Sequence, residues 1–138
     1  WGSAAIRLGM AFASVEIIAI FNKVKYPYNI NILTQKQALT MLDNASQIKD
    51  WVKILLNERA NLIKSLKELS IVRHIYPTDA NFVLVKVNDA NATYEKLVEK
   101  GIIVRNRNTV VLCEGGLRIT VGTPEENAIL LSELKKMK

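Results

Sequence analysis

The feature that most constrains the fold is a change of hydrophobic period near residue 70. Over residues 45–69 apolar side chains recur at helical spacing and predict one long helix. Arg59 falls on this stripe where another apolar residue is expected. Residues 72–76 and 81–87 then read as extended strands, separated by a turn at residues 77–79. A small sheet covered by helices on one side is therefore expected from about Ala45, an α/β or α+β module.

Further start and stop signals complete this module. Asn88 or Asp89 can cap a helix over residues 91–100, and Gly101 can end it. Short strands are predicted at residues 102–105, 110–112 and 117–121. Thr123 and Glu126, which flank a proline in the first helical position, form a capping box that opens a last helix.

The N-terminal third is predicted to begin with a buried strand over residues 6–13, in which Gly9 allows close backbone approach. Ser14 can then cap a helix over residues 15–24, with Glu16 in its first turn. A loop containing Pro27 follows. Next, Thr34 to Gln37 has the pattern of a capping box, which predicts a helix from Thr34 to about residue 44.

Composition excludes several classes of protein. The chain has 138 residues, of which 49% are hydrophobic and 23% charged, as in a globular domain. No stretch approaches the roughly 20 apolar residues of a membrane helix. One cysteine and one histidine, Cys113 and His74, exclude an internal disulfide and offer too few ligands for a metal site. A reducing cytoplasm is expected, with no metal and no membrane partner.

The net charge of +6 brings nucleic acid into consideration. The lysines are scattered, however, and often stand beside glutamates on predicted helix faces. The one dense basic run, at residues 135–138, suits the C-terminal end of a helix. We therefore expect no nucleic-acid partner.

Motifs for nucleophilic catalysis or phosphate binding are absent: the chain has no G-x-S-x-G, no P-loop and no G-x-G-x-x-G. His74 is interpreted as a structural strand residue. Cys113, beside Glu114, is interpreted as an inert small side chain. Two arginines on predicted buried strands, Arg7 and Arg118, are harder to assign to structure. Each has either an internal salt bridge or a role as a fixed guanidinium for a carboxylate or phosphate ligand.

Five segments resemble, in the expected order, pyridoxal 5'-phosphate (PLP) enzymes of the aspartate aminotransferase fold, and in particular their histidinol-phosphate aminotransferase branch. The segments are residues 1–9, 28–31, 79–85, 101–105 and 117–123. Threonine-phosphate decarboxylases are the nearest sister branch. The resemblance implies that residues 1–44 are a remnant of the large PLP-binding domain with its interdomain connection. It also implies that residues 45–138 are the C-terminal small domain.

The resemblance also assigns roles to three arginines. Arg7 matches the arginine that holds the cofactor phosphate, and Arg118 matches the arginine that grips the substrate anion. Arg105 matches a second arginine near the substrate phosphate, whereas Arg107 is expected at the surface. The implied substrates are L-histidinol phosphate and glutamate with 2-oxoglutarate, in histidine biosynthesis. The implied assembly is a cytoplasmic homodimer of the full-length enzyme.

The Schiff-base lysine of this family would lie just before Trp1, so the sequence contains no catalytic residue of that kind. The chain is therefore expected to be the C-terminal part of an aminotransferase and to be inactive alone. Two alternatives stay open at this point: a related PLP enzyme such as a threonine-phosphate decarboxylase, and a non-catalytic anion-binding module.

Overall fold

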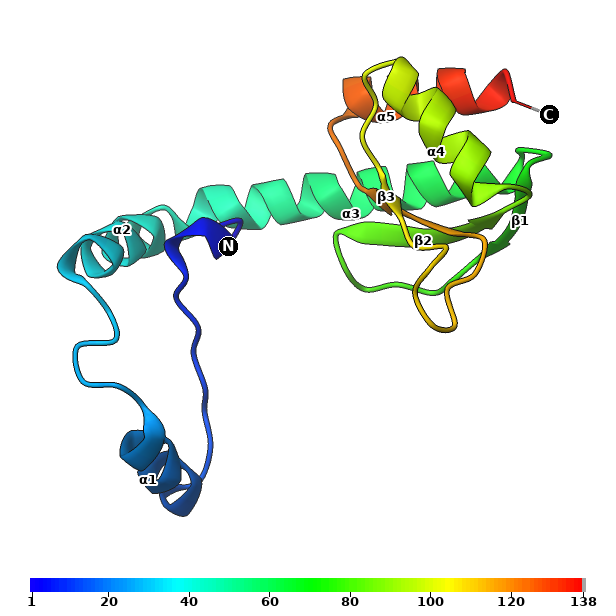
Figure 1. Ribbon diagram of the computed structural model, residues 1–138. Helices are drawn as coiled ribbons and strands as arrows, with labels where there is room; N and C mark the ends of the chain where they lie inside the picture. Colours follow the sequence, from blue (N-terminus) through cyan, green and yellow to red (C-terminus); the bar gives the residue numbers. More distant parts are fainter. Residues whose placement is uncertain (138) are drawn as a thin grey trace. The chain divides into compact units, whose positions relative to one another are not determined.

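The computed structural model describes residues 1–137 and divides into two compact units, Trp1–Trp51 and Val52–Lys138 (Figure 1). Helix α3, Ala45–Lys67, contains the boundary between the units. It begins at the predicted residue and ends two residues before the predicted end.

The second unit contains a four-stranded sheet in which every neighbouring pair is antiparallel. Its strands are β1 (Val72–Ile75), β2 (Phe82–Val87), β3 (Arg105–Asn106) and β4 (Gly116–Thr120), in the spatial order β1-β2-β4-β3. The small mixed helix-and-sheet unit predicted for this region is confirmed.

Period-two alternation gives the sheet two different faces. Buried side chains of β2 and β4 alternate with half-buried or exposed ones. The buried face packs against α3, α4 (Ala90–Glu99) and α5 (Pro124–Lys135). The core combines Leu62, Leu66, Leu97, Leu130 and Leu134 of the helices with Val83, Val85, Leu117 and Ile119 of the strands. The helices that form this core do not pack against the other face of the sheet. That face carries Phe82, Leu84, Lys86 and Arg118.

The ends of α4 and α5 follow the predicted signals. Asp89 caps α4 by accepting a hydrogen bond from the Ala92 backbone N–H at 3.0 Å. Gly101 follows α4 with φ of 74°, a conformation that glycine adopts without strain. At α5 both halves of the predicted capping box between Thr123 and Glu126 are present. Local sequence signals therefore fix where these two helices begin and where α4 ends.

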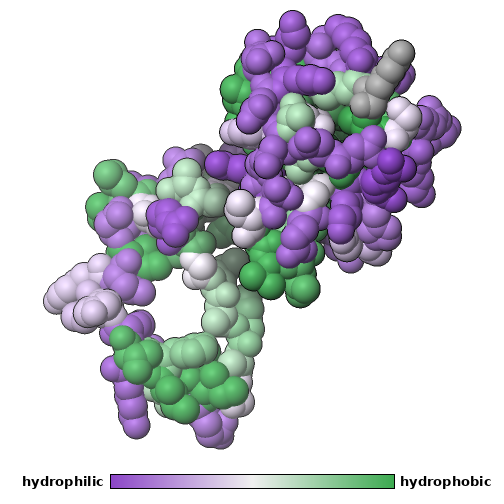
Figure 2. All heavy atoms as spheres, turned by 45° about the vertical axis from the view of Figure 1, so that its right-hand side comes forward, coloured by the Kyte–Doolittle hydropathy of each residue, from purple (hydrophilic) through white to green (hydrophobic). Residues whose placement is uncertain are grey.

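The first unit contains a 3₁₀ turn η1 (Ala4–Ile6) and the helices α1 (Val15–Val24) and α2 (Ile32–Asp43). None of its 51 residues, all of them described, is buried. Phe12 and Tyr28 are 92% and 98% exposed. Apolar side chains gather over α1 on the face in view in Figure 2. An exposed apolar surface of this kind is typical of a segment that packs against other protein.

Helix α1 has the predicted bounds, but Ser14 does not cap it in the predicted manner. The Ser14 side chain makes no capping bond to the backbone. Instead, hydrogen bonds from the Ser14 hydroxyl and from the backbone N–H of Glu16 hold the pKa of the Glu16 carboxyl below its usual value.

Two predictions for the first unit are wrong. The strand predicted over residues 6–13 is not formed: Ile6 ends η1, and residues 7–13 have no strand in this unit with which to pair. Helix α2 begins at Ile32 rather than after Thr34. Its cap is Asn31, whose Oδ1 accepts a hydrogen bond from the Thr34 N–H at 2.9 Å. Asparagine is as good a cap as threonine, so the earlier signal prevails.

Two strand predictions in the second unit also need correction. The strand expected at residues 102–105 is reduced to Arg105–Asn106. Residues 110–112 form turns instead of a strand. Val110 N–H donates to the Arg107 carbonyl and Cys113 N–H to the Val110 carbonyl, both at 2.9 Å. Leu112 has φ of 66°, which is incompatible with an extended strand.

No helix among residues 1–137 has the length and apolar character needed to cross a bilayer.

Candidate functional site

The register of the sheet brings Arg105 and Arg118 together. Arg118 lies directly opposite Arg105 on β3 and opposite Leu84 on β2. Directly opposed residues of antiparallel strands present their side chains on the same face. Both guanidinium groups therefore rise from the face that the helices leave uncovered. This juxtaposition joins two residues that are 13 positions apart in the chain.

Arg118 has an unusual environment for an arginine in a sheet. Its guanidinium carbon lies 5.0 Å from the centre of the Phe82 ring, within the range of a cation–π contact. Its Nε atom is buried and has no hydrogen-bond partner among residues 1–137. No carboxylate of those residues forms an ion pair with it. The internal salt bridge considered from the sequence is therefore not formed within residues 1–137, which leaves a buried donor for an external acceptor.

Arg105 is exposed and belongs to a strand of only two residues. Like charges directly opposite each other on neighbouring strands are destabilising. Neither arginine is neutralised by a carboxylate within residues 1–137. The pair thus forms a local positive field that suits a ligand with two or more anionic oxygens.

Asparagines hold β3 and the following loop in place. Asn106 Nδ2 donates to Asn91 Oδ1 of α4 at 2.8 Å. Asn106 Oδ1 accepts from the Asn108 backbone N–H at 2.9 Å. Asn108 Oδ1 accepts from the Gly115 N–H at 2.8 Å, which joins the two ends of the loop before β4. These bonds fix the strand segment that carries Arg105.

Arg7 belongs to the first unit and does not lie on a strand, contrary to the prediction. It ends η1 with φ of 57°, and its N–H donates to the Ala4 carbonyl at 3.1 Å. Its side chain is exposed and forms no ion pair with residues 1–137. The structure therefore leaves its guanidinium available to an anion.

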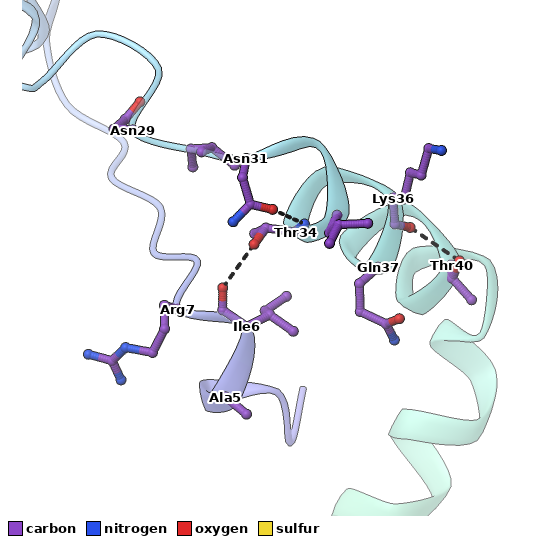
Figure 3. Close-up of a pocket in the computed structure, with 11 residues that line it drawn as sticks. Ala5, Ile6, Arg7, Asn29, Asn31, Thr34, Lys36, Gln37 and Thr40 are labelled. Carbon is purple, nitrogen blue, oxygen red and sulfur yellow. Dashed lines mark hydrogen bonds between the residues drawn. The ribbon is translucent and has the colours of Figure 1, made fainter.

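A cavity of about 560 Å³ lies beside Arg7 in the first unit (Figure 3). It is lined by residues 5–7, 29–31, 33, 34, 36, 37 and 40. The Thr34 hydroxyl donates to the Ile6 carbonyl at 3.4 Å and joins η1 to α2 across it. In Figure 3 the Arg7 side chain projects away from Gln37 and Thr40.

Of a PLP molecule, only the phosphate has a matching group here, since the Arg7 guanidinium forms no ion pair within residues 1–137 and could accept an anion. Lys36 also belongs to the cavity lining, but its side chain projects away from Arg7 in Figure 3. The resemblance places no residue of this chain at the Schiff-base position. The fit is thus to the phosphate end of the cofactor alone.

The remaining candidates serve structural contacts. The His74 ring packs edge-on against Tyr76, with centroids 4.6 Å apart and planes at 80°. Cys113 is a half-buried free thiol in the turn before β4. Within residues 1–137 no three histidine, cysteine, aspartate or glutamate side chains cluster as metal ligands would. Arg107, expected at the surface, is half-buried.

Sequence reasoning missed Phe82, which lies under the Arg118 guanidinium. The signal available was its place on a strand in which both faces are apolar. The sequence shows Arg59 as an interruption of the apolar stripe but predicts no partner for it. In the structure Arg59 Nη1 donates to the Ala80 carbonyl at 2.8 Å.

The family model described as "Aminotransferase class I and II" matches residues 1–134. The chain therefore belongs to the class I and II aminotransferase family, whose members are PLP-dependent. The structure of the chain is similar to solved structures of that fold. It superposes on the histidinol-phosphate aminotransferase from Clostridium acetobutylicum with a TM-score of 0.79 at 24% identity, over 88% of this chain and 37% of that one. A putative aminotransferase from Burkholderia pseudomallei gives 0.79 at 28% identity, with the same shares covered.

Curated relatives narrow the similarity further. A protein of Parabacteroides distasonis named histidinol-phosphate aminotransferase is 55% identical over 138 residues, which is 100% of this chain. A protein of the same name from Bacteroides thetaiotaomicron is 54% identical over 99% of this chain. The chain spans about two fifths of the length of these relatives, 40% and 39%.

Proposed function

We propose that this chain is the C-terminal part of a PLP-dependent aminotransferase. The full-length enzyme transfers an amino group between L-histidinol phosphate and 2-oxoglutarate or glutamate in histidine biosynthesis. The names of relatives at 54–55% identity support the reaction. The observation in the structure that carries the proposal is the pair of unneutralised arginines on one face of the sheet, Arg118 with its buried Nε donor and Arg105 opposite it.

In this proposal Arg118 binds the substrate anion by paired hydrogen bonds. A planar guanidinium can bind a carboxylate and a phosphate in the same bidentate manner, because each offers two oxygens at matching spacing. One residue can then hold the phosphate of histidinol phosphate in one half-reaction and a carboxylate of glutamate in the other. The Phe82 ring below the guanidinium keeps its plane oriented.

Arg105 distinguishes the two substrates in this proposal. A phosphate dianion carries more charge than a carboxylate and gains more from a second cation. Arg105 is exposed, so its contribution depends on the ionic strength, whereas that of the partly buried Arg118 depends on it less.

Arg7 is the proposed ligand of the cofactor phosphate in the first unit. When bound, PLP supplies the electron sink for the transfer of the amino group. The chain itself contributes the binding of anions, and the imine-forming lysine belongs to the part of the enzyme that precedes residue 1. The proposed division is residues 1–44 as part of the large domain and its connection, and 45–138 as the small domain. The apolar side chains exposed over residues 1–51 support this division, because the rest of a large domain would cover them.

We infer further that the full-length enzyme is a cytoplasmic homodimer, in keeping with the family resemblance and the single cysteine. A phosphate-substrate decarboxylase is not favoured over this proposal. L-threonine-O-3-phosphate decarboxylase from Porphyromonas gingivalis shares the fold, with a TM-score of 0.71, at a sequence identity of 21%.

The test is substitution of the two arginines in the full-length enzyme. Arg118→Ala should raise the KM for both substrates, since loss of a bidentate charged contact costs about 2–4 kcal/mol, or roughly 30- to 1,000-fold. Arg118→Lys should recover part of this loss. Arg105→Ala should weaken the binding of histidinol phosphate much more than the binding of glutamate. Arg73→Ala, which removes an exposed arginine of β1, is the matched control. Unchanged kinetics in Arg118→Ala would overturn the proposal, as would a full-length enzyme that turns over no histidinol phosphate.

A further inference from the structure

Two adjacent residues of α3, Glu58 and Arg59, make hydrogen bonds to α5 and to the loop before β2, near the end of the sheet where β2 begins and β4 ends. Arg59 Nη1 donates to the Ala80 carbonyl at 2.8 Å, and Glu58 Oε2 accepts from Asn127 Nδ2 at 2.9 Å. We propose that Glu58 and Arg59 are positioning residues that set the orientation of Arg118. The inference rests on the proposed function of Arg118 as the ligand of the substrate anion.

Arg59 acts on the loop that leads into Phe82. The Ala80 carbonyl accepts from Arg59, while the Ala80 N–H donates to the Thr78 hydroxyl at 3.1 Å. The same hydroxyl donates to the Phe82 carbonyl at 2.9 Å. These three bonds hold the backbone of Phe82, whose ring lies 5.0 Å from the Arg118 guanidinium carbon. Arg59 thus reaches Arg118 through the aromatic ring on which the guanidinium rests.

Glu58 acts on the other strand through Asn127, which is only 5% exposed. Asn127 Oδ1 accepts from the Gly122 N–H at 3.0 Å, and its Nδ2 donates to the Gly122 carbonyl at 3.1 Å. A Cβ at residue 122 would lie 2.7 Å from Glu126 Oε2, so the backbone is pressed closely against α5. The end of β4 is therefore tied to both α3 and α5.

The two strand ends are also tied to each other, because the Val121 N–H donates to the Asn81 carbonyl at 2.9 Å. Arg118 itself has no ion pair and no bond to its Nε among residues 1–137. Its orientation thus depends on where the backbone of β4 and the ring of Phe82 lie. A binding side chain is held to productive geometry only if its supporting groups are themselves fixed. Glu58 and Arg59 supply that support from one turn of α3.

The direct test is the mobility of the Arg118 side chain in the 138-residue chain, measured by ¹⁵N relaxation of its Nε–Hε group. In the parent chain we expect an order parameter near the rigid value of about 0.85. Arg59→Met and Glu58→Ala should each lower it below about 0.6 while the amide spectrum keeps its native dispersion. Glu58→Gln, which keeps an acceptor for Asn127, and Arg73→Met, which removes an exposed arginine, should leave it unchanged.

A purely structural role predicts a different result: lower stability with an unchanged Arg118 order parameter in the folded fraction, which would overturn the inference. If Arg59→Met loses the native amide spectrum, the Arg118 order parameter is measured in Arg59→Lys and Glu58→Ala instead, and these two variants decide between the roles. In the full-length enzyme the same variants should raise the KM for histidinol phosphate about 5-fold and leave kcat within about twofold, as expected for lost ground-state binding. If mobility rises and KM stays constant, the positioning stands and the proposed role of Arg118 falls.

Discussion

Replacement of Arg118 by methionine should stabilise the 138-residue chain while removing the guanidinium proposed to bind the substrate anion. The Arg118 Nε is buried without a hydrogen-bond partner, and an unsatisfied buried donor costs about 1–3 kcal/mol. Methionine keeps much of the apolar stem and removes that donor. It also relieves the opposition to Arg105, worth about 0.2–1 kcal/mol.

The substitution loses one favourable interaction, the contact with the Phe82 ring, which contributes about 0.5–1 kcal/mol at a partly exposed site. The balance of these contributions is a gain in the free energy of unfolding of about 0.2–3.5 kcal/mol. Urea denaturation of the chain, followed by the methyl NMR signals of the core residues Val83 and Val85, measures it. Arg73→Met is the control and should stay within about 0.5 kcal/mol of the parent. A loss of more than about 1 kcal/mol in Arg118→Met would mean that Arg118 is a structural residue, and the argument from its unpaired donor would fail.

Three further predictions concern other parts of the chain. Ser14→Ala should raise the pKa of Glu16 toward its ordinary value, measured by ¹³C-detected titration of the carboxyl, because it removes the first of the bonds that lower it. Since the folded pKa is the depressed one, the associated stability is present above the unfolded pKa and is lost as pH falls through the folded value, and an unshifted titration would refute this. Thr123→Ala should cost about 1 kcal/mol in urea unfolding through the capping box, whereas Thr109→Ala should cost little. The chain mixed with PLP should stay colourless, and borohydride should fix no stoichiometric label on one lysine; specific labelling with turnover would show an enzyme complete in itself.

The parts of the fold that depend on local signals could be predicted from the sequence. The start of α3, the Asp89 cap and the Thr123 box all follow from residues within one turn of the helix end. The strand over residues 6–13 failed for the opposite reason. An apolar segment becomes a strand only beside another strand, and that information is not local.

In the candidate site, too, the sequence predicts what is local and misses what depends on distant residues. Arg118 and Arg105 are recognisable from their own segments, Arg118 by its place on a predicted buried strand and both by the family resemblance. Their position opposite each other depends on the pairing of β3 with β4, which no single segment encodes. The absence of a carboxylate partner for Arg118 likewise required every other described side chain to be in place. Arg59 is visible in the sequence as an irregularity in the apolar stripe of a helix, but its partner is a backbone carbonyl 21 residues away.

The brevity of β3 has a consequence for how this site can vary. Only two residue pairs join β3 to β4 and hold Arg105 opposite Arg118, whereas five residue pairs join β2 to β4. A one-residue slip would turn the Arg105 side chain to the opposite face and place Asn106 in its stead. The bond of Asn106 to Asn91 opposes such a slip. Insertion or deletion of one residue between Gly101 and Arg105 is thus a route by which a descendant could lose the second cation while keeping the fold.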